Sequence, residues 1–96
     1  MSAPDESAVR LNPAANRYES VLEGHLSILE FVVEGDRMII THTLVPPELR
    51  GRGIAEKLTR VALGDARTKR LKVVPACSYV ARFIDRHTEY RDLVAP

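Results

Sequence analysis

Cysteine is nearly absent from this sequence of 96 residues, which contains only Cys77, and tryptophan is absent altogether. A single thiol cannot form a disulfide within the chain, so packing alone must stabilise the fold, and a reducing compartment is expected. Aromatic residues are also few, at three tyrosines and two phenylalanines, and the sequence contains no recognised nucleic-acid-binding motif. We therefore do not expect a nucleic acid as a partner.

Long apolar segments are missing as well. The longest, residues 28–33 and 38–40, are interrupted by charged residues, and they fall short of the about 18 residues that span a membrane. The N-terminus has no apolar core of the kind that signal peptides contain. These absences predict a soluble, cytoplasmic protein that does not bind membranes.

Size and composition fit one domain. A chain of 96 residues, of which 45% are hydrophobic and 28% charged, can enclose one hydrophobic core but not two. Residues 1–15 contain two prolines and few large apolar side chains, so they are predicted to be a flexible lead-in. Residues 16–96 are predicted to form the single domain.

Charge is distributed unevenly along the chain. Residues 1–49 carry eight acidic side chains against three basic ones, a net charge of −5, and residues 50–96 carry eleven basic against five acidic, a net charge of +6. A basic half of this kind suits either a nucleic acid or a small phosphorylated ligand. For any single Lys or Arg, a position on a solvated helix face is the alternative that is favoured.

Apolar residues alternate between positions 16 and 45, which predicts strands. Gly24 and the pair Gly35-Asp36 fall where hairpin turns are needed. The predicted strands are Asn16–Glu23, His25–Glu34 and Arg37–Val45. The second has apolar residues on both faces, which predicts burial on both sides.

Two consecutive prolines end the third strand, because proline cannot donate to a strand ladder. Helical spacing follows over Ile54–Lys69, with a shared apolar face made of Ile54, Leu58, Val61, Ala62 and Ala66. A strand is predicted at Leu71–Pro75 and a helix at Ser78–Arg86. The order β-β-β-α-β-α predicts an α+β fold with a mostly antiparallel sheet and one parallel βαβ unit.

The connection before the first helix is rich in arginine and glycine, with RGRGIA at Arg50–Ala55. Gly51 and Gly53 let the backbone turn without a Cβ, and the helix start supplies free amides and the positive end of a dipole. With the added charge of Arg50 and Arg52, this segment suits an anion such as a pyrophosphate. Glycines that only allow close packing of helix on strand are an equally open explanation. The Lys-Ser/Thr of a P-loop and the third glycine of a dinucleotide-binding fold are missing.

Several motifs, in order along the chain, resemble one family. RGRGIA matches the Gln/Arg-x-x-Gly-x-Gly/Ala signature of GNAT-type N-acetyltransferases. The likeness is greater to the small stand-alone N-acetyltransferase-like domain proteins, which share HT-x-VPPELRGRGIA, LKVVP, C-x-YV and RH-x-EY. Here these motifs occupy residues 42–55, 71–75, 77–80 and 86–90. The resemblance implies a minimal acyl-CoA N-acyltransferase (GNAT)-like fold.

The resemblance also implies a site for acetyl-CoA or coenzyme A, where the third and fourth predicted strands diverge. In this interpretation the backbone of Leu44 and Val45 holds the pantetheine arm. The pyrophosphate is held by Arg50, Gly51, Arg52, Gly53, Ile54 and Ala55. Basic residues of the second half would face the adenosine phosphates, and the second substrate would be an amine that the sequence does not identify.

Acetyl transfer to an amine needs a group that takes a proton and a group that assists the departing thiolate. His42 is predicted near the end of the third strand on the same face as Ile40 and Leu44, and histidine suits a general base. A histidine hydrogen-bonded within the sheet is the alternative. Cys77 is predicted at the start of a helix, where it could act as an acid or as an acylated nucleophile, or be an inert core residue.

Two positions depart from the family pattern. Leu44 stands where close relatives often have a glutamate, and Phe83 and Ile84 occupy the region in which a tyrosine acid is usual. These departures favour an alternative function, a coenzyme A-binding module with little or no catalytic activity. No histidine or cysteine spacing identifies a metal site, and we expect a monomer or a weak homodimer formed through the exposed first strand.

Overall fold

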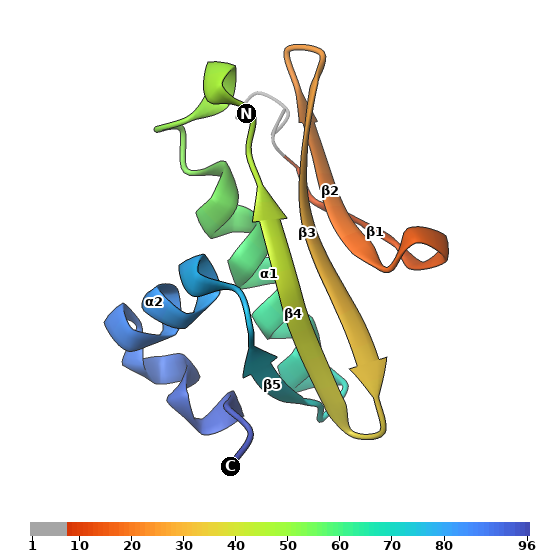
Figure 1. Ribbon diagram of the computed structural model, residues 1–96, viewed down its shortest axis with the longest axis vertical. Coiled ribbons are helices and arrows are strands. Elements are labelled where there is room, and N and C mark those ends of the chain that lie inside the picture. Colours follow the sequence, from red (N-terminus) through yellow and green to blue (C-terminus); the bar gives the residue numbers. More distant parts are fainter. Residues whose placement is uncertain (1–7) are drawn as a thin grey trace, which may run out of the picture.

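The computed structural model describes residues 8–96, which form a five-stranded sheet with α1 packed on one face and α2 near the β5 edge (Figure 1). In chain order the elements are β1 (Arg10–Asn12), η1 (Pro13–Ala15), β2 (Arg17–Leu22), β3 (His25–Glu34), β4 (Arg37–Leu44), η2 (Pro47–Leu49), α1 (Ile54–Thr68), β5 (Lys72–Pro75), α2 (Ser78–Arg86) and η3 (Thr88–Leu93). The strands lie in sequence order, antiparallel except for the parallel pair β4–β5. The predicted α+β fold with a parallel βαβ unit is confirmed.

The sheet has one strand more than the sequence predicted. Arg10–Asn12 form β1, which pairs antiparallel with β2 and covers the edge that was expected to be exposed. This part of the predicted flexible lead-in is therefore in the sheet, whereas residues 1–7 lie outside the described residues. A strand of three residues is too short to show alternation in a sequence.

The prediction that β3 is buried on both faces was wrong for most of the side that faces away from α1, where Ile28 is buried but its apolar neighbours are not. Leu29 and Phe31 are buried beneath α1, but Leu26 and Val32 are 40% and 41% exposed on the opposite side. We call that side the open face, because no helix of residues 8–96 crosses it (Figure 1). Within the same range no helix is long and apolar enough to cross a membrane.

The core joins the inner face of the sheet to both helices. Its α1 contribution consists of Ile54, Leu58, Ala62, Leu63 and Ala66. Val61, predicted for this face, is 38% exposed instead. Tyr18 of β2 is fully buried, and its hydroxyl donates to Asp65 of α1 at 2.7 Å. Burial and this carboxylate raise the pKa of the Tyr18 phenol.

We expect Tyr18→Phe to lower the free energy of unfolding by about 1.5 kcal/mol, because it removes a hydrogen bond to a charged acceptor. Tyr79→Phe is the matched control, since the Tyr79 hydroxyl is on a side chain that is 38% exposed and should change stability by less than about 0.5 kcal/mol. Urea denaturation at neutral pH measures both. Equal effects would show that the Tyr18–Asp65 bond does not stabilise the fold.

Candidate functional site

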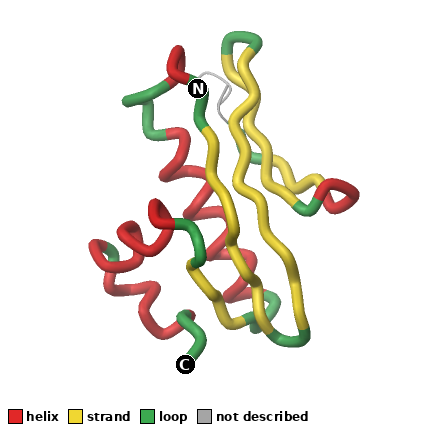
Figure 2. Tube along the Cα trace, in the orientation of Figure 1, coloured by secondary structure: helices red, strands yellow, loops and turns green. Residues whose placement is uncertain are grey.

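The site begins where β4 and β5 separate. Their pairing ends at Ile40 and Pro75, and the amide of Cys77 donates the last bond across the gap to the Ile40 carbonyl at 3.0 Å. Beyond that point β4 continues to Leu44 while the chain after β5 turns into α2 (Figure 2). Residues 41–44 therefore have no β5 partner, and the strands diverge at the place that the sequence analysis expected.

A β-bulge in β4 decides which side chains face the helices. Ile40 pairs with Phe31 and His42 pairs with Glu30, so Thr41 is an extra residue without a partner in the register. Neighbouring residues of β3 point to opposite faces, and His42 therefore lies on the open face, exposed and opposite to Ile40. The prediction that His42 shares a face with Ile40 was wrong, because it assumed unbroken alternation.

Thr43 lies on the helix side, opposite the buried Leu29, and its hydroxyl is 3.4 Å from the Sγ atom of Cys77. Cys77 is the N-cap residue of α2 and is partly buried. Burial raises the pKa of the Cys77 thiol, but the Thr43 hydroxyl and backbone groups of Val80, Tyr79 and Thr43 outweigh it and lower this pKa below its usual range. Cys77 is thus a thiol whose surroundings favour the thiolate.

The glycine loop before α1 has the backbone of an anion site. Gly51 and Gly53 have φ angles of +82° and +78°, and Gly53 is an N-cap without a side-chain cap, so the first amides of α1 are left for another acceptor. A Cβ built on either glycine meets nothing within 4 Å. Close packing therefore does not explain these glycines; the left-handed backbone does.

The two loop arginines have different surroundings. Arg52 forms an ion pair with Glu23 in the β2–β3 turn, and this pair lowers the pKa of the Glu23 carboxyl. Arg50 forms neither a hydrogen bond nor an ion pair with any other residue in the range 8–96. Of the two loop arginines, Arg50 is therefore the one whose guanidinium has no partner among residues 8–96.

Two overlapping cavities connect the end of β4 with this loop. The first, of about 230 Å³, is lined by Thr43, Leu44, Val45, Arg50, Ala55 and Tyr79. The second, of about 270 Å³, is lined by Val45, Leu49, Arg50, Gly51, Gly53, Ile54, Ala55, Glu56 and Tyr79. Because they share four lining residues, we treat them as one groove, the β4–α1 groove. It combines an apolar wall with backbone amides and one free arginine, which suits a long ligand with an anionic group.

The structure gathers most of the predicted binding residues in this groove. Those that line it are Leu44, Val45, Arg50, Gly51, Gly53, Ile54 and Ala55. Cys77 adjoins the groove through Thr43, whereas the Arg52 side chain turns toward Glu23 and His42 lies on the open face. No group of three or more His, Cys, Asp or Glu side chains in residues 8–96 is arranged to hold a metal ion.

Sequence reasoning missed Thr43 and left Tyr79 unassigned. Thr43 gave no signal, because the bulge rather than its residue type places it against Cys77. Tyr79 follows Cys77 by two residues in the first turn of α2, a position that could have indicated the groove. Burial and the carboxylate of Glu56 raise the pKa of its phenol. It therefore presents a neutral hydroxyl to the groove at neutral pH.

The family model for GCN5-related N-acetyl-transferase matches residues 17–93. Among solved structures, the chain resembles the NMR solution structure of a GCN5-like protein from Staphylococcus aureus, named as a candidate N-acetyltransferase. The TM-score is 0.75 at 22% sequence identity, over 96% of this chain and 91% of that one. At this identity the structural likeness shows the fold.

Since the family model covers most of its length, the chain belongs to the GCN5-related N-acetyltransferase family. Its fold is that of a small acyl-CoA N-acyltransferase domain. Membership supports acyl transfer as the general class of activity and does not favour the alternative of a module that only binds coenzyme A.

Replacing Gly53 by alanine should lower the free energy of unfolding by about 1–2 kcal/mol, because its φ of +78° is costly for a residue with a Cβ. Gly64→Ala is the matched control. Gly64 lies inside α1 with open space around its Cβ position, so alanine should raise stability by up to about 1 kcal/mol. Thermal or urea unfolding tests the opposite signs; a stabilising Gly53→Ala would contradict the left-handed cap.

Thr43→Val should raise the pKa of the Cys77 thiol toward its ordinary value, because it removes the hydroxyl that stabilises the thiolate. The measurement is the pH dependence of alkylation by iodoacetamide, which reports Cys77 alone since the chain has no other cysteine. Thr41→Val is the control, because the Thr41 hydroxyl donates to the Glu30 carbonyl instead. An unchanged pKa in Thr43→Val would contradict the assigned contact.

Proposed function

We propose that this protein transfers an acetyl group from acetyl-CoA to an amine. The observation that supports this most is the continuous groove from Thr43, beside the Cys77 thiol, to the glycine loop at Gly51 and Gly53. Along the groove lie a reactive sulfur, an apolar wall and an anion site. A thioester of coenzyme A has the matching parts in the same order: the thioester, the pantetheine arm and the pyrophosphate.

The residues fit coenzyme A at both ends of the groove. Leu44 ends β4 beyond its pairing with β5 and Val45 follows it, so their backbone can hydrogen-bond the amides of the pantetheine arm. The uncapped first amides of α1 and the free guanidinium of Arg50 can bind the pyrophosphate. When bound, acetyl-CoA supplies an acetyl group that is activated as a thioester.

Cys77 is the proposed catalytic residue, in one of two roles. The lowered pKa of its thiol favours the nucleophile: the thiolate sulfur bonds to the acetyl carbon while the bond to the coenzyme sulfur breaks. The amine nitrogen then bonds to the acetyl carbon, the bond to the Cys77 sulfur breaks and restores the thiolate, and the amine proton passes to a general base or to water. In the other role, a protonated Cys77 gives its proton to the departing sulfur.

His42 remains the proposed general base, but the bulge restricts the side from which the amine can approach it. Its imidazole lies on the open face beside Glu30, away from Thr43 and Cys77 on the helix side. It can therefore accept a proton only from an amine that approaches across the open face. A loss of activity in His42→Ala, with the rise in Tm on adding coenzyme A unchanged, would support this route.

The first test is thermal unfolding with and without excess coenzyme A. Ligand at about 100 times its dissociation constant adds about 2.7 kcal/mol of stability, which a domain of 96 residues shows as a clear rise in Tm. No shift at millimolar coenzyme A would overturn the proposed site.

The second test is release of coenzyme A from acetyl-CoA in the presence of a panel of amines. Cys77→Ala should reduce kcat/KM about 100-fold or more, while its Tm shift with coenzyme A stays close to that of the unchanged protein. Arg37→Gln, at the far end of β4, is the control that should leave turnover unaffected. Binding without turnover for any amine would contradict the enzymatic part of the proposal.

Intact mass after incubation with acetyl-CoA alone separates the two roles of Cys77. An added acetyl group that is absent in Cys77→Ser supports the nucleophile. Transfer activity without such a species, together with activity retained by Cys77→Ser, supports the proton donor.

A further inference from the structure

The open face of the sheet carries an apolar patch close to the free end of β4. On this face Val21 pairs with Leu26, and in the next row of side chains Ile28 pairs with Leu44. Val21, Leu26 and Leu44 are 58%, 40% and 48% exposed, and Ile28 lies among them at 9%. We call these four residues the apolar patch. Contiguous exposed apolar side chains, unlike isolated ones, mark a binding surface.

Leu44 connects the apolar patch with the β4–α1 groove. It lies opposite Ile28 on the open face, and it also lines the part of the groove that contains Thr43. Since residues 41–44 have no β5 partner, β4 has a free edge here. A ligand on the open face can therefore reach the groove beside Thr43 around this edge, without separating two hydrogen-bonded strands.

The row of side chains next to the apolar patch supplies a negative charge. Glu30 lies on the open face opposite His42. Its carboxylate forms no ion pair or hydrogen bond with another residue of the range 8–96. Arg17, its neighbour on β2, pairs instead with Glu19 at 2.6 Å. The free carboxylate of Glu30 suits an ammonium group, which it would hold beside the proposed base His42.

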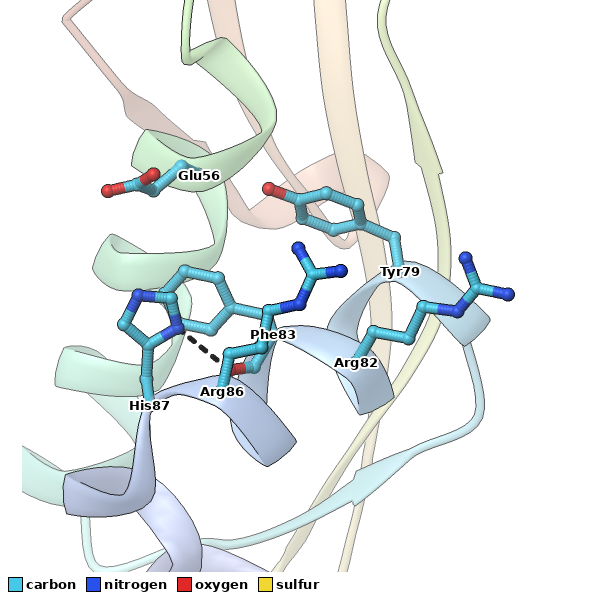
Figure 3. Close-up of a pocket in the computed structure, with 6 residues that line it drawn as sticks. All are labelled: Glu56, Tyr79, Arg82, Phe83, Arg86 and His87. Atoms are coloured by element: carbon cyan, nitrogen blue, oxygen red, sulfur yellow. Dashed lines mark hydrogen bonds between the residues drawn. The ribbon is translucent and has the colours of Figure 1, made fainter.

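The cavity between α1 and α2 is less suited to a cation. Its volume is about 290 Å³, and it is lined by Glu56, Tyr79, Arg82, Phe83, Arg86 and His87 (Figure 3). The two arginines repel an ammonium group, and Glu56 is already paired with Arg60 at 3.0 Å. The His87 ring stacks on Phe83 at 4.0 Å between centroids. This cavity therefore lacks the free carboxylate that the open face offers.

We propose that the acceptor binds on the open face and is a primary amine with an apolar substituent, an inference that rests on the proposed function. Glu30 attracts its ammonium group, His42 accepts the proton, and the substituent packs on the apolar patch. Successive rows on one face of a strand are about 7 Å apart, so a chain of about eight carbons runs from His42 over Leu44 to Leu26.

The experiment measures kcat/KM for acetyl transfer to propylamine, octylamine and 1,8-diaminooctane. Complete burial of a methylene is worth about fourfold and an open face covers about half of it, so octylamine should exceed propylamine about thirtyfold. The diamine has the same chain, but its second ammonium would lie on the apolar patch. It should lose most of the gain, because a charge placed on apolar side chains loses hydration.

Variants of the sheet locate the effect. Leu26→Ala should lower the ratio of octylamine to propylamine about threefold, and Val21→Ala should lower it in the same direction. Val32→Ala is the matched control. Val32 lies on the same face of β3 and is 41% exposed, but it is on the far side of the Glu30 row, so the ratio should not change. Glu30→Gln should raise KM for all three amines and leave the rise in Tm on adding coenzyme A unchanged.

Each contrary outcome overturns a stated part of the inference. Equal kcat/KM for propylamine and octylamine, or a diamine as good as octylamine, would overturn the apolar substituent and leave the proposed function intact. An equal fall of the ratio in Val32→Ala would overturn the assignment to the apolar patch. A dimer that Leu26→Ala dissociates in sedimentation, with the ratio unchanged, would show that the patch joins two copies of the chain instead. Failure to acetylate any amine would overturn the proposed function itself.

Discussion

The separation of β4 from β5 after the Ile40–Pro75 pair is the constraint on which the site depends. Pro75 cannot donate to the ladder, and the amide of Cys77 makes the last bond to Ile40 before α2 begins. The sheet therefore ends at this bond, which also fixes the backbone of Cys77 at the start of α2. The open edge of β4, the cap of α2 and the groove all follow from that arrangement.

The uneven charge of the sequence is used in two different ways. Some basic residues of the second half are paired with acids, as in Arg52–Glu23, which links the glycine loop to the β2–β3 turn, and Arg67–Asp92, which links α1 to η3. Such exposed pairs stabilise only weakly, but they leave a smaller set of free guanidinium groups. Arg50, which belongs to this set, lies in the β4–α1 groove.

The sequence predicted both α-helices, the strands β2 to β5 and the glycine loop, because hydrophobic spacing, prolines and glycines act over a few neighbouring residues. It could not predict that Thr41 is extra, since a bulge depends on the register between two strands and not on residue type. The wrong face for His42 and the missed Thr43 both follow from this. Likewise, nothing in the alternation of β3 revealed that its second apolar face is left open, because burial depends on where helices pack.

Tyr79 shows the same limit for the helices. Spacing along the chain assigned no role to Tyr79, and the structure places it in the wall of both cavities of the β4–α1 groove and of the cavity between α1 and α2. Only the packing of α2 beside α1 brings it there. The separation of Tyr79 from the glycine loop along the sequence did not show that the two lie close together in the folded chain.

The extra residue in β4 also means that the register of this strand is under as strict a constraint as its composition. If the bulge were lost with all residues kept, simple alternation would pair Thr41 with Glu30 and His42 with Leu29, bringing His42 to the helix side and turning Thr43 away from Cys77. Every side chain could be kept and the site would still be lost. Homologous chains are therefore comparable position by position only where they share this bulge.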